Sequence, residues 1–371
     1  MLLFLAERLS DIPVVNAFTY TTTRALLGFL TAFILSLLIG QPVIKQLYLR
    51  GYKDYPRAYG QDNVGSKKYT PTMGGVLIAI TAMIASLLWA DLSDARVWIV
   101  IASVVLHGGI GYFDDTAKKN AKNADKGMSR IGKLIPQAGF GVFLGLCACF
   151  NWFDIFPMVD GDHFGKAIIL PFFKAPFMIV PGIVMVILAT GWSIGISNAV
   201  NYTDGLDGML SVPAFFCFLV LAVYSFVMGN ATNADYLLYP FLSGANELSV
   251  ICSIFMGCCL GFLWFNSFPA EVFMGDFGSL LLGGVLMTIA FLMHQEVILV
   301  ISGGIFMFQF FSSAIQDYYF IKFKGERGFR GGPFHQGLKT SYKMAEAKIV
   351  VRYWIVSAIL AAMCLVVMKL R

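Results

Sequence analysis

Aspartates gather in three short segments of this chain, each beside a hydrophobic stretch. Asp114 and Asp115 are adjacent in Gly-Tyr-Phe-Asp-Asp, and Asp276 stands in Phe-Met-Gly-Asp-Phe-Gly-Ser. Asp204 and Asp207 are three residues apart, a spacing that places both on one face of a helical turn. Two carboxylates about 5 Å apart repel by roughly 3 kcal/mol at an effective dielectric constant near 20, which a bound cation or a shared proton would relieve. Such acids, with lysines nearby, suit a divalent cation and a diphosphate.

Each acidic segment also has a simpler interpretation. Asp114 and Asp115 could be solvated acids at a helix end that form surface pairs with the lysines after them. Asp204 and Asp207 could form Asx-turns and a helix cap, and Asp276 could cap the next helix. Two Asp and two Asn within residues 198–208, between long apolar stretches, favour a ligand-binding interpretation of that segment.

Basic and glycine-rich segments accompany the acids. Lys67-Lys-Tyr-Thr-Pro-Thr-Met-Gly-Gly precedes a hydrophobic stretch and would suit a phosphate or a polar ring, and Lys118 and Lys122 follow the paired acids. The Gly-Asp-x-Gly-Ser turn at Asp276 opens a helix, and helix starts favour anions such as phosphate. His335 is the only histidine expected in a cytoplasmic loop.

The elements that must position these residues are membrane helices. Of the 371 residues, 58% are hydrophobic and only 13% charged, and the mean hydropathy is +0.73. A soluble core does not need so little charge, and a helix needs about 20 mostly apolar residues to cross a bilayer. We therefore expect an all-α polytopic membrane protein, a single transmembrane catalytic domain over residues 1–371. About ten spans are expected, at 24–45, 73–90, 97–113, 133–150, 177–199, 209–229, 248–266, 279–294, 297–321 and 348–368.

Basic residues predict the orientation of these spans. Twenty of the 27 Lys and Arg lie in the loops 45–68, 118–133 and 322–352, all on one side of the bundle. By the positive-inside rule that side is cytoplasmic, so both termini face outward and every acid named above faces the cytoplasm. The net charge of +5 fits contact with anionic lipid heads, and no basic-aromatic pattern indicates nucleic acid.

Three further segments have expected structures. Residues 1–20 should form a short interfacial helix and not a cleaved signal, and residues 151–176 a short hairpin or an amphipathic piece on the outer side. The pair Gly303-Gly304 should break or bend the ninth span, so that its second part leaves the bundle.

With these motifs the chain resembles the bacterial phospho-N-acetylmuramoyl-pentapeptide transferases. The resemblance lies in Lys-Lys-Tyr-Thr-Pro-Thr-Met-Gly-Gly, Phe-Asp-Asp, Asn-Ala-Val-Asn-x-Thr-Asp-Gly-Leu-Asp-Gly and Leu-Trp-Phe-Asn-Ser-Phe-Pro-Ala…Phe-Met-Gly-Asp-x-Gly-Ser. Motif order and spacing match from about residue 67 to the C-terminus. The wider superfamily of polyprenyl-phosphate sugar-1-phosphate transferases shares the acids but not usually the wording of the first and third motifs.

The resemblance implies ten transmembrane helices, a homodimer in the bacterial inner membrane, Mg²⁺ as cofactor and a cleft that faces the cytoplasm. It also implies the first membrane step of peptidoglycan synthesis. In that reaction UDP-N-acetylmuramoyl-pentapeptide and undecaprenyl phosphate give lipid I and UMP.

The resemblance also implies roles for individual residues. Asp276 and Asp204 are expected to ligate Mg²⁺, and Asp114 or Asp115 to engage the lipid phosphate or act as a base; His335 completes the catalytic set. The Phe273 ring is expected to stack on uracil. The expected substrate-binding residues are Lys67, Thr72, Lys118, Lys122, Lys133, Asn201, Asp204, Leu206, Asp207, Asn266, Phe273 and Gly275.

This chain departs from the family pattern at three places. His335-Gln336-Gly337 stands where the family has three consecutive histidines, so roles of the second and third histidines do not carry over. Gln309 replaces a glutamate usual in the ninth span, and Ala345-Glu346-Ala347 replaces a Pro-Glu-Pro.

Two other functions are compatible with parts of the pattern. One is a sibling transferase that moves N-acetylglucosamine-1-phosphate onto a polyprenyl phosphate. The other is a secondary transporter, whose ionisable groups should lie near the bilayer midplane, whereas the acids here lie at span ends. For the transferase, direct attack by the lipid phosphate and a two-step route through an aspartyl-phosphate both remain open.

Overall fold

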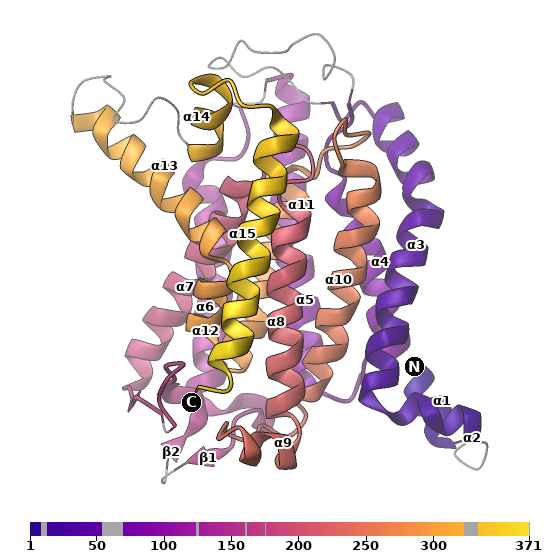
Figure 1. Ribbon diagram of the computed structural model, residues 1–371, viewed down its shortest axis with the longest axis vertical. Coiled ribbons are helices and arrows are strands. Elements are labelled where there is room, and N and C mark those ends of the chain that lie inside the picture. The colour runs from indigo at the N-terminus through magenta and orange to yellow at the C-terminus, as the bar shows by residue number, and fades with distance from the viewer. Residues whose placement is uncertain are drawn as a thin grey trace.

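A bundle of long helices makes up this protein in the computed structural model, which describes residues 1–8, 13–53, 70–123, 126–159, 162–174, 176–322 and 333–370 (Figure 1). The long helices run up and down through the molecule, and short helices and hairpins lie at their ends. In chain order the elements are α1 (Leu2–Arg8), α2 (Pro13–Asn16), η1 (Ala17–Thr19), α3 (Thr21–Leu49), α4 (Gly75–Trp89), α5 (Ala95–Ala121), α6 (Arg130–Phe150), η2 (Trp152–Asp154), β1 (Met158–Val159), β2 (Asp162–His163), η3 (Phe164–Lys166), β3 (Ala167–Ile168), β4 (Met178–Ile179), α7 (Gly182–Thr203), α8 (Ser211–Met228), α9 (Ala231–Tyr236), α10 (Asn246–Asn266), α11 (Gly275–Leu292), α12 (Glu296–Ser302), α13 (Gly304–Lys322), α14 (Phe334–Thr340) and α15 (Glu346–Val367).

Most of the expected spans are present as helices that can cross a bilayer. In the described part of the chain, eight helices are long and apolar enough (α3, α5, α6, α7, α8, α10, α11 and α15), and α12 with α13 makes a ninth if the bent pair is one span. The expected span at 73–90 corresponds to α4, which has only 15 residues and is shorter than a span requires. The chain is thus a multi-pass membrane protein with the predicted helical fold, while the count of ten stays a prediction.

The predicted break at the glycine pair is confirmed. α12 ends at Ser302, Gly303 caps it, and α13 starts at Gly304 with its axis bent by 80° from that of α12. As a result α13 points away from the bundle, as Figure 1 shows at upper left.

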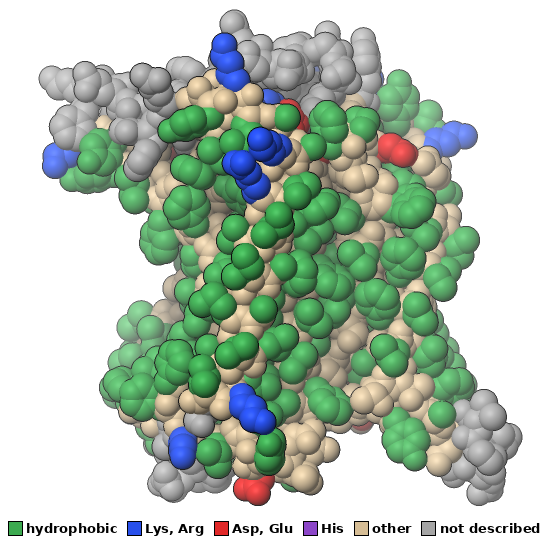
Figure 2. Space-filling view, viewed as in Figure 1, with side chains coloured by type: hydrophobic (Ala, Val, Ile, Leu, Met, Phe, Trp, Pro, Cys, Tyr) green, Lys and Arg blue, Asp and Glu red, His purple; other side chains and the backbone are tan. Residues whose placement is uncertain are grey.

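Small residues let α3 and α10 approach each other closely. Gly28, Ala32, Ser36 and Gly40 recur every four residues along the buried face of α3. On α10, a Cβ added to Gly261 would overlap the side chain of Ser36, so the two backbones are nearly in contact. The opposite face of α3 carries exposed apolar side chains (Leu26, Leu30, Ile34 and Leu38). Figure 2 shows that hydrophobic side chains cover much of the surface along the middle of the bundle.

Buried ion pairs join distant parts of the chain at the end of the bundle that holds both termini (Figure 1). Arg24 of α3 pairs with Glu247 of α10 through contacts of 2.5 and 2.7 Å, and Glu247 also accepts a hydrogen bond from the backbone N–H of Asp91 at 3.0 Å. Arg96 of α5 pairs with Asp94 at 3.1 Å and donates to the carbonyl oxygens of Ile155 and Ser243. We call these two groups of contacts the terminal-end clamp.

The short segments expected at this end are also present. The described residues before Tyr20 contain α1, α2 and η1, and residues 158–179 contain two small antiparallel hairpins, β1 with β2 and β3 with β4. Their placement at a membrane interface, and the outward orientation of both termini, remain predictions.

Candidate active site

The start of α11 is shaped so that Asp276 enters the bundle beside α5. Gly275 opens the helix with φ = +74°, a conformation that L side chains rarely adopt. A Cβ at Gly275 would lie 2.7 Å from Oδ2 of Asp115, 2.9 Å from the backbone nitrogen of Met73 and 3.0 Å from Oγ1 of Thr72. Only glycine fits there, so the predicted residue Gly275 has a backbone role, with Thr72 next to it.

Further glycines bring α4 and α5 against the same turn. A Cβ on Gly111 of α5 would overlap the backbone of Asp276 and Phe277, and a Cβ on Gly75 of α4 would overlap the backbone of Gly278. Because these helices touch through their backbones, the carboxylates of α5 and α11 lie side by side.

Asp115 caps the N-terminus of α11. It is buried, and its two carboxylate oxygens accept hydrogen bonds from the backbone N–H groups of Asp276 at 3.3 Å and Phe277 at 3.1 Å. Backbone N–H groups at a helix start carry partial positive charge and favour a carboxylate. The contact joins α5 to α11 and fixes the position of Asp276.

The three acids meet in one cluster, as the sequence predicts. Asp114, Asp115 and Asp276 each offer a carboxylate oxygen, and these oxygens lie within 4.8 Å of one another. The side chains of Asp114 and Asp115 are buried, whereas that of Asp276 is 19% exposed. Among the residues that the structure describes, no other group of three or more His, Cys, Asp or Glu side chains is placed so that it could hold a metal ion. Asp204, the other expected metal ligand, lies outside the group at the C-cap of α7.

Two lysines bridge the acids. Nζ of Lys118 lies 2.6 Å from Asp114 and 3.1 Å from Asp276, and Nζ of Lys133 lies 2.9 Å from Asp114 and 2.6 Å from Asp276. Lys133 belongs to α6, so the cluster joins three long helices. Asp114 also accepts a hydrogen bond from the backbone N–H of Met128 at 2.7 Å. The chain therefore brings three carboxylates and two ammonium groups to one point.

The donor set fits Mg²⁺. All three candidate ligands are carboxylates, and hard cations such as Mg²⁺ prefer oxygen ligands. The part-exposed Asp276 is open to an incoming ion or phosphate, while Asp115 is already held by backbone groups.

Asn201 reaches the same turn from α7. Its side-chain amide donates to Oγ of Ser279 at 2.8 Å, and Oγ of Ser279 donates to the carbonyl oxygen of Gly275 at 3.0 Å. The structure thus places the predicted residue Asn201 at the site. Ser279 was not predicted from the sequence, although it is the serine of the Gly-Asp-x-Gly-Ser motif that contains Asp276.

Asp207 and Asn266 join the loop before α8 to the loop before α11. Asp207 accepts a hydrogen bond from the backbone N–H of Ala270 at 3.2 Å. Asn266 accepts from the backbone N–H of Gly208 at 3.0 Å and donates to the carbonyl oxygen of Val272 at 2.8 Å. Both are buried, so the structure gives them a bracing role in addition to the predicted contact with substrate.

The bracing fixes the loop that carries Phe273. The backbone N–H of Phe273 donates to the carbonyl oxygen of Pro71 at 2.8 Å, and its carbonyl oxygen accepts from Gly74 at 2.8 Å. Leu206, another expected substrate-binding residue, is 9% exposed. Lys122 is exposed at the C-cap of α5, and its contact with substrate stays a prediction. Lys67 lies outside the described residues.

His335 is buried on α14. Its Nδ1 lies 3.3 Å from Oε1 of Gln309 on α13, and a Cβ added to Gly205 would overlap its Nε2. The structure therefore brings His335 against the backbone just after Asp204. A catalytic role for His335 stays a prediction.

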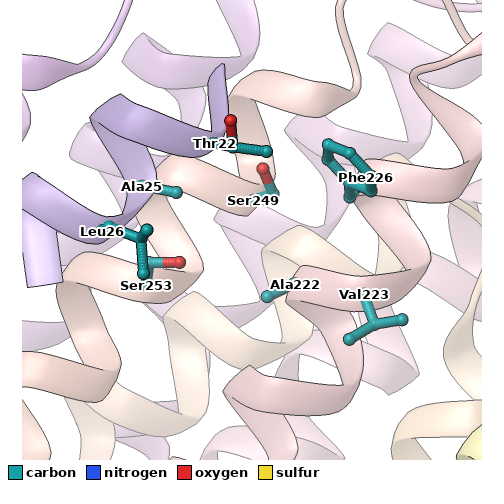
Figure 3. Close-up of a pocket in the computed structure, with 8 residues that line it drawn as sticks. All are labelled: Thr22, Ala25, Leu26, Ala222, Val223, Phe226, Ser249 and Ser253. Carbon is teal, nitrogen blue, oxygen red and sulfur yellow. The ribbon is translucent and has the colours of Figure 1, made fainter. Parts of the chain in front are cut away.

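An apolar groove elsewhere on the molecule does not belong to this site. It is lined by residues of α3, α8 and α10 near the first turns of α3 and α10, as the close-up in Figure 3 shows (Thr22, Ala25, Leu26, Ala222, Val223, Phe226, Ser249 and Ser253). It contains no acid or amine, so it offers nothing for phosphate chemistry.

Comparison with known proteins agrees with the geometry. The family model of glycosyl transferase family 4 matches residues 97–294, which include all three clustered acids. The phospho-N-acetylmuramoyl-pentapeptide-transferase signature 1 matches residues 67–78. A phospho-N-acetylmuramoyl-pentapeptide-transferase of Citrifermentans bemidjiense is 38% identical, over 98% of this chain and 97% of the relative, and one of Geobacter sp. strain M21 matches with the same identity and coverage. The chain therefore belongs to the phospho-N-acetylmuramoyl-pentapeptide-transferase family.

Proposed function

We propose that this protein transfers phospho-N-acetylmuramoyl-pentapeptide from its UDP-linked donor to undecaprenyl phosphate, giving lipid I and UMP. The reaction takes place at the cytoplasmic face of the bacterial inner membrane. The observation that carries the proposal is the cluster of Asp114, Asp115 and Asp276 with Lys118 and Lys133, in a chain whose full-length relatives bear that transferase name.

Mg²⁺ would be held chiefly by Asp276, with Asp114 or Asp115 beside it. When bound, the ion would neutralise charge on the donor diphosphate. Asp204 is the further ligand that we propose from the family resemblance, although it stands outside the three-acid group.

The two lysines have a defined task in this reaction. Donor diphosphate and acceptor phosphate are both anions, and their approach costs electrostatic energy unless positive charge lies between them. Lys118 and Lys133 hold ammonium groups between two carboxylates, at the point where the reacting phosphates would meet. They would bind and orient the phosphate oxygens.

Direct attack needs little help from a base. A phosphate monoester has a second pKa near 6, so the lipid phosphate is largely dianionic at neutral pH. One of its oxygens forms a bond to the β-phosphorus of the donor, and the bond from that phosphorus to the UMP oxygen breaks with its electron pair. Asp114 and Asp115 then serve mainly to position the lysines and α11, as their contacts indicate.

The uridine would lie beside the loop before α11. Phe273 is held there by two backbone hydrogen bonds, which would fix its ring for stacking on uracil. Lys67, Leu206 and Asp207 complete the proposed uridine contacts. We also propose that two copies of the chain form a homodimer.

The purified protein, with Mg²⁺, undecaprenyl phosphate and the UDP-linked muramoyl-pentapeptide, should release UMP and form a lipid-linked product. UDP-N-acetylglucosamine should neither replace the donor nor compete with it. Turnover of UDP-N-acetylglucosamine alone would instead identify the sibling transferase, and no UMP from either donor would contradict both assignments.

A further inference from the structure

The short helix α14 is attached to the bent helix α13 through one face of α13. The rings of Phe308 and Phe334 pack edge to face with centroids 5.0 Å apart. One turn further along α13, Oγ of Ser312 accepts a hydrogen bond from the backbone N–H of Phe334 at 3.3 Å. Gln309 lies between Phe308 and Ser312 on α13, and its side chain contacts His335, the residue after Phe334.

Three buried polar side chains from three helices meet at that point. Gln309 of α13 is 0% exposed, His335 of α14 is 1% exposed and Tyr353 of α15 is 8% exposed. The side-chain amide of Gln309 donates to the hydroxyl of Tyr353, and its oxygen lies 3.3 Å from Nδ1 of His335. A single amide thus connects the histidine to the last membrane helix.

The amide oxygen determines which nitrogen of His335 carries the proton. A carbonyl oxygen only accepts hydrogen bonds, so Nδ1 must be the protonated nitrogen that donates to it. In a neutral imidazole Nε2 is then left with its lone pair. Nε2 faces the backbone of Gly205, because a Cβ at Gly205 would overlap it. Gly205 directly follows Asp204 and belongs to the loop that carries Asp207.

We propose that Gln309 is a positioning residue for His335 in the transfer reaction. Its amide, held by Tyr353, fixes both the tautomer and the orientation of the imidazole and directs Nε2 to the 204–208 loop. The proposal rests on the proposed function, since it assigns Gln309 an effect on that reaction.

The test is a double-mutant cycle on turnover with Gln309→Met and His335→Ala. Methionine has about the same length but its thioether is only a weak acceptor, so Gln309→Met should lower kcat by about 10-fold or more. If Gln309 acts through the histidine, Gln309→Met should cause no further loss in the His335→Ala background. Equal losses in both backgrounds, or wild-type turnover in His335→Ala, would overturn the proposal.

A conservative variant separates positioning from packing. In Gln309→Glu the carboxylate still accepts from Nδ1–H, so turnover should stay far above that of Gln309→Met. A Gln309→Glu protein as inactive as Gln309→Met, while still folded, would contradict the proposed role of the acceptor.

A second pair of variants controls for loss of stability in α15. Tyr353→Phe removes the hydroxyl that holds the Gln309 amide and should lower kcat. Tyr224→Phe removes another buried tyrosine hydroxyl that bonds α15, through the carbonyl oxygen of Cys364 at 2.9 Å, and should leave kcat unchanged. Thermal unfolding in detergent measures the stability of each variant. Equal losses of kcat in the two variants would reject the proposal, and UMP release by the wild-type protein tests the proposed function separately.

Discussion

The three clustered aspartates differ in their hydrogen bonds to the backbone and in the exposure of their side chains. Asp115 accepts two backbone hydrogen bonds from the start of α11, and Asp114 accepts one from Met128 and contacts both lysines. Asp276 contacts the same lysines but is the only one of the three with a part-exposed side chain. Asp276 is thus the carboxylate that remains available to a metal ion or to substrate.

Replacing Asp276 by Asn should therefore lower turnover most. We expect Asp276→Asn to lose more than the roughly 10- to 100-fold typical of losing a hydrogen-bond partner of a metal ligand. Asp114→Asn and Asp115→Asn should lose less, because the lipid phosphate needs little help from a base. Steady-state UMP release at saturating Mg²⁺ ranks the three variants. Near-normal turnover in Asp276→Asn would invert this order.

The sequence predicted which acids belong to the site but not which contacts each of them makes. Asp114 and Asp115 are neighbours in sequence, and a helix turns neighbours about 100° apart, so one points to Met128 and the other to α11. Which acid takes which direction depends on the partner helix. In the sequence, Gln309 is recognisable only as a departure from the family pattern. Its contact with His335 could not be predicted, because the two residues are 26 positions apart.

At the scale of elements, hydrophobic length predicted the helices well. Nine of the ten expected spans coincide with a span-length helix or with the bent pair, because crossing a bilayer imposes a length that sequence reveals, and the span at 73–90 coincides with the shorter α4. The Gly303–Gly304 break was predictable because glycine pairs weaken a helix locally. The close approach of Gly111 to α11 was not predictable, because a glycine in a sequence does not indicate which helix packs against it.

That close approach can be tested with two glycines of one helix. Gly111→Ala should disrupt the α5–α11 contact and abolish most turnover, because its Cβ would overlap the Asp276–Phe277 backbone. Gly109→Ala, two residues earlier, meets no atom within 4 Å and should keep wild-type turnover. UMP release and thermal unfolding of both variants provide the measurements. Equal activity of the two proteins would show that the contact does not matter.

At the scale of the whole molecule, the two clusters of charged side chains found among the described residues lie at opposite ends of the bundle. The acid cluster stands at the last turns of α5 and the first turn of α11, and the terminal-end clamp includes Arg96 in the first turn of α5. A transporter needs such groups near the middle of the bilayer. This distribution, together with the family, favours chemistry at one membrane surface.

The orientation of the bundle can be tested with single added cysteines. Thr232→Cys on α9 should react with a membrane-impermeant maleimide in intact cells, and Lys126→Cys should react only after the membrane is opened. Both positions are exposed, whereas six of the seven natural cysteines are buried, so the wild-type protein should give a low background. Labelling of Lys126→Cys in intact cells would reverse the predicted topology.

The terminal-end clamp has a consequence for stability. Removing one partner of a buried ion pair typically costs 3–5 kcal/mol, and Arg24 with Glu247 ties α3 to α10 while Arg96 ties α5 to the carbonyl oxygens of two distant loops. Loss of Arg24 or of Glu247 alone should therefore weaken the α3–α10 contact at the end of the bundle that holds both termini, far from the aspartates and lysines.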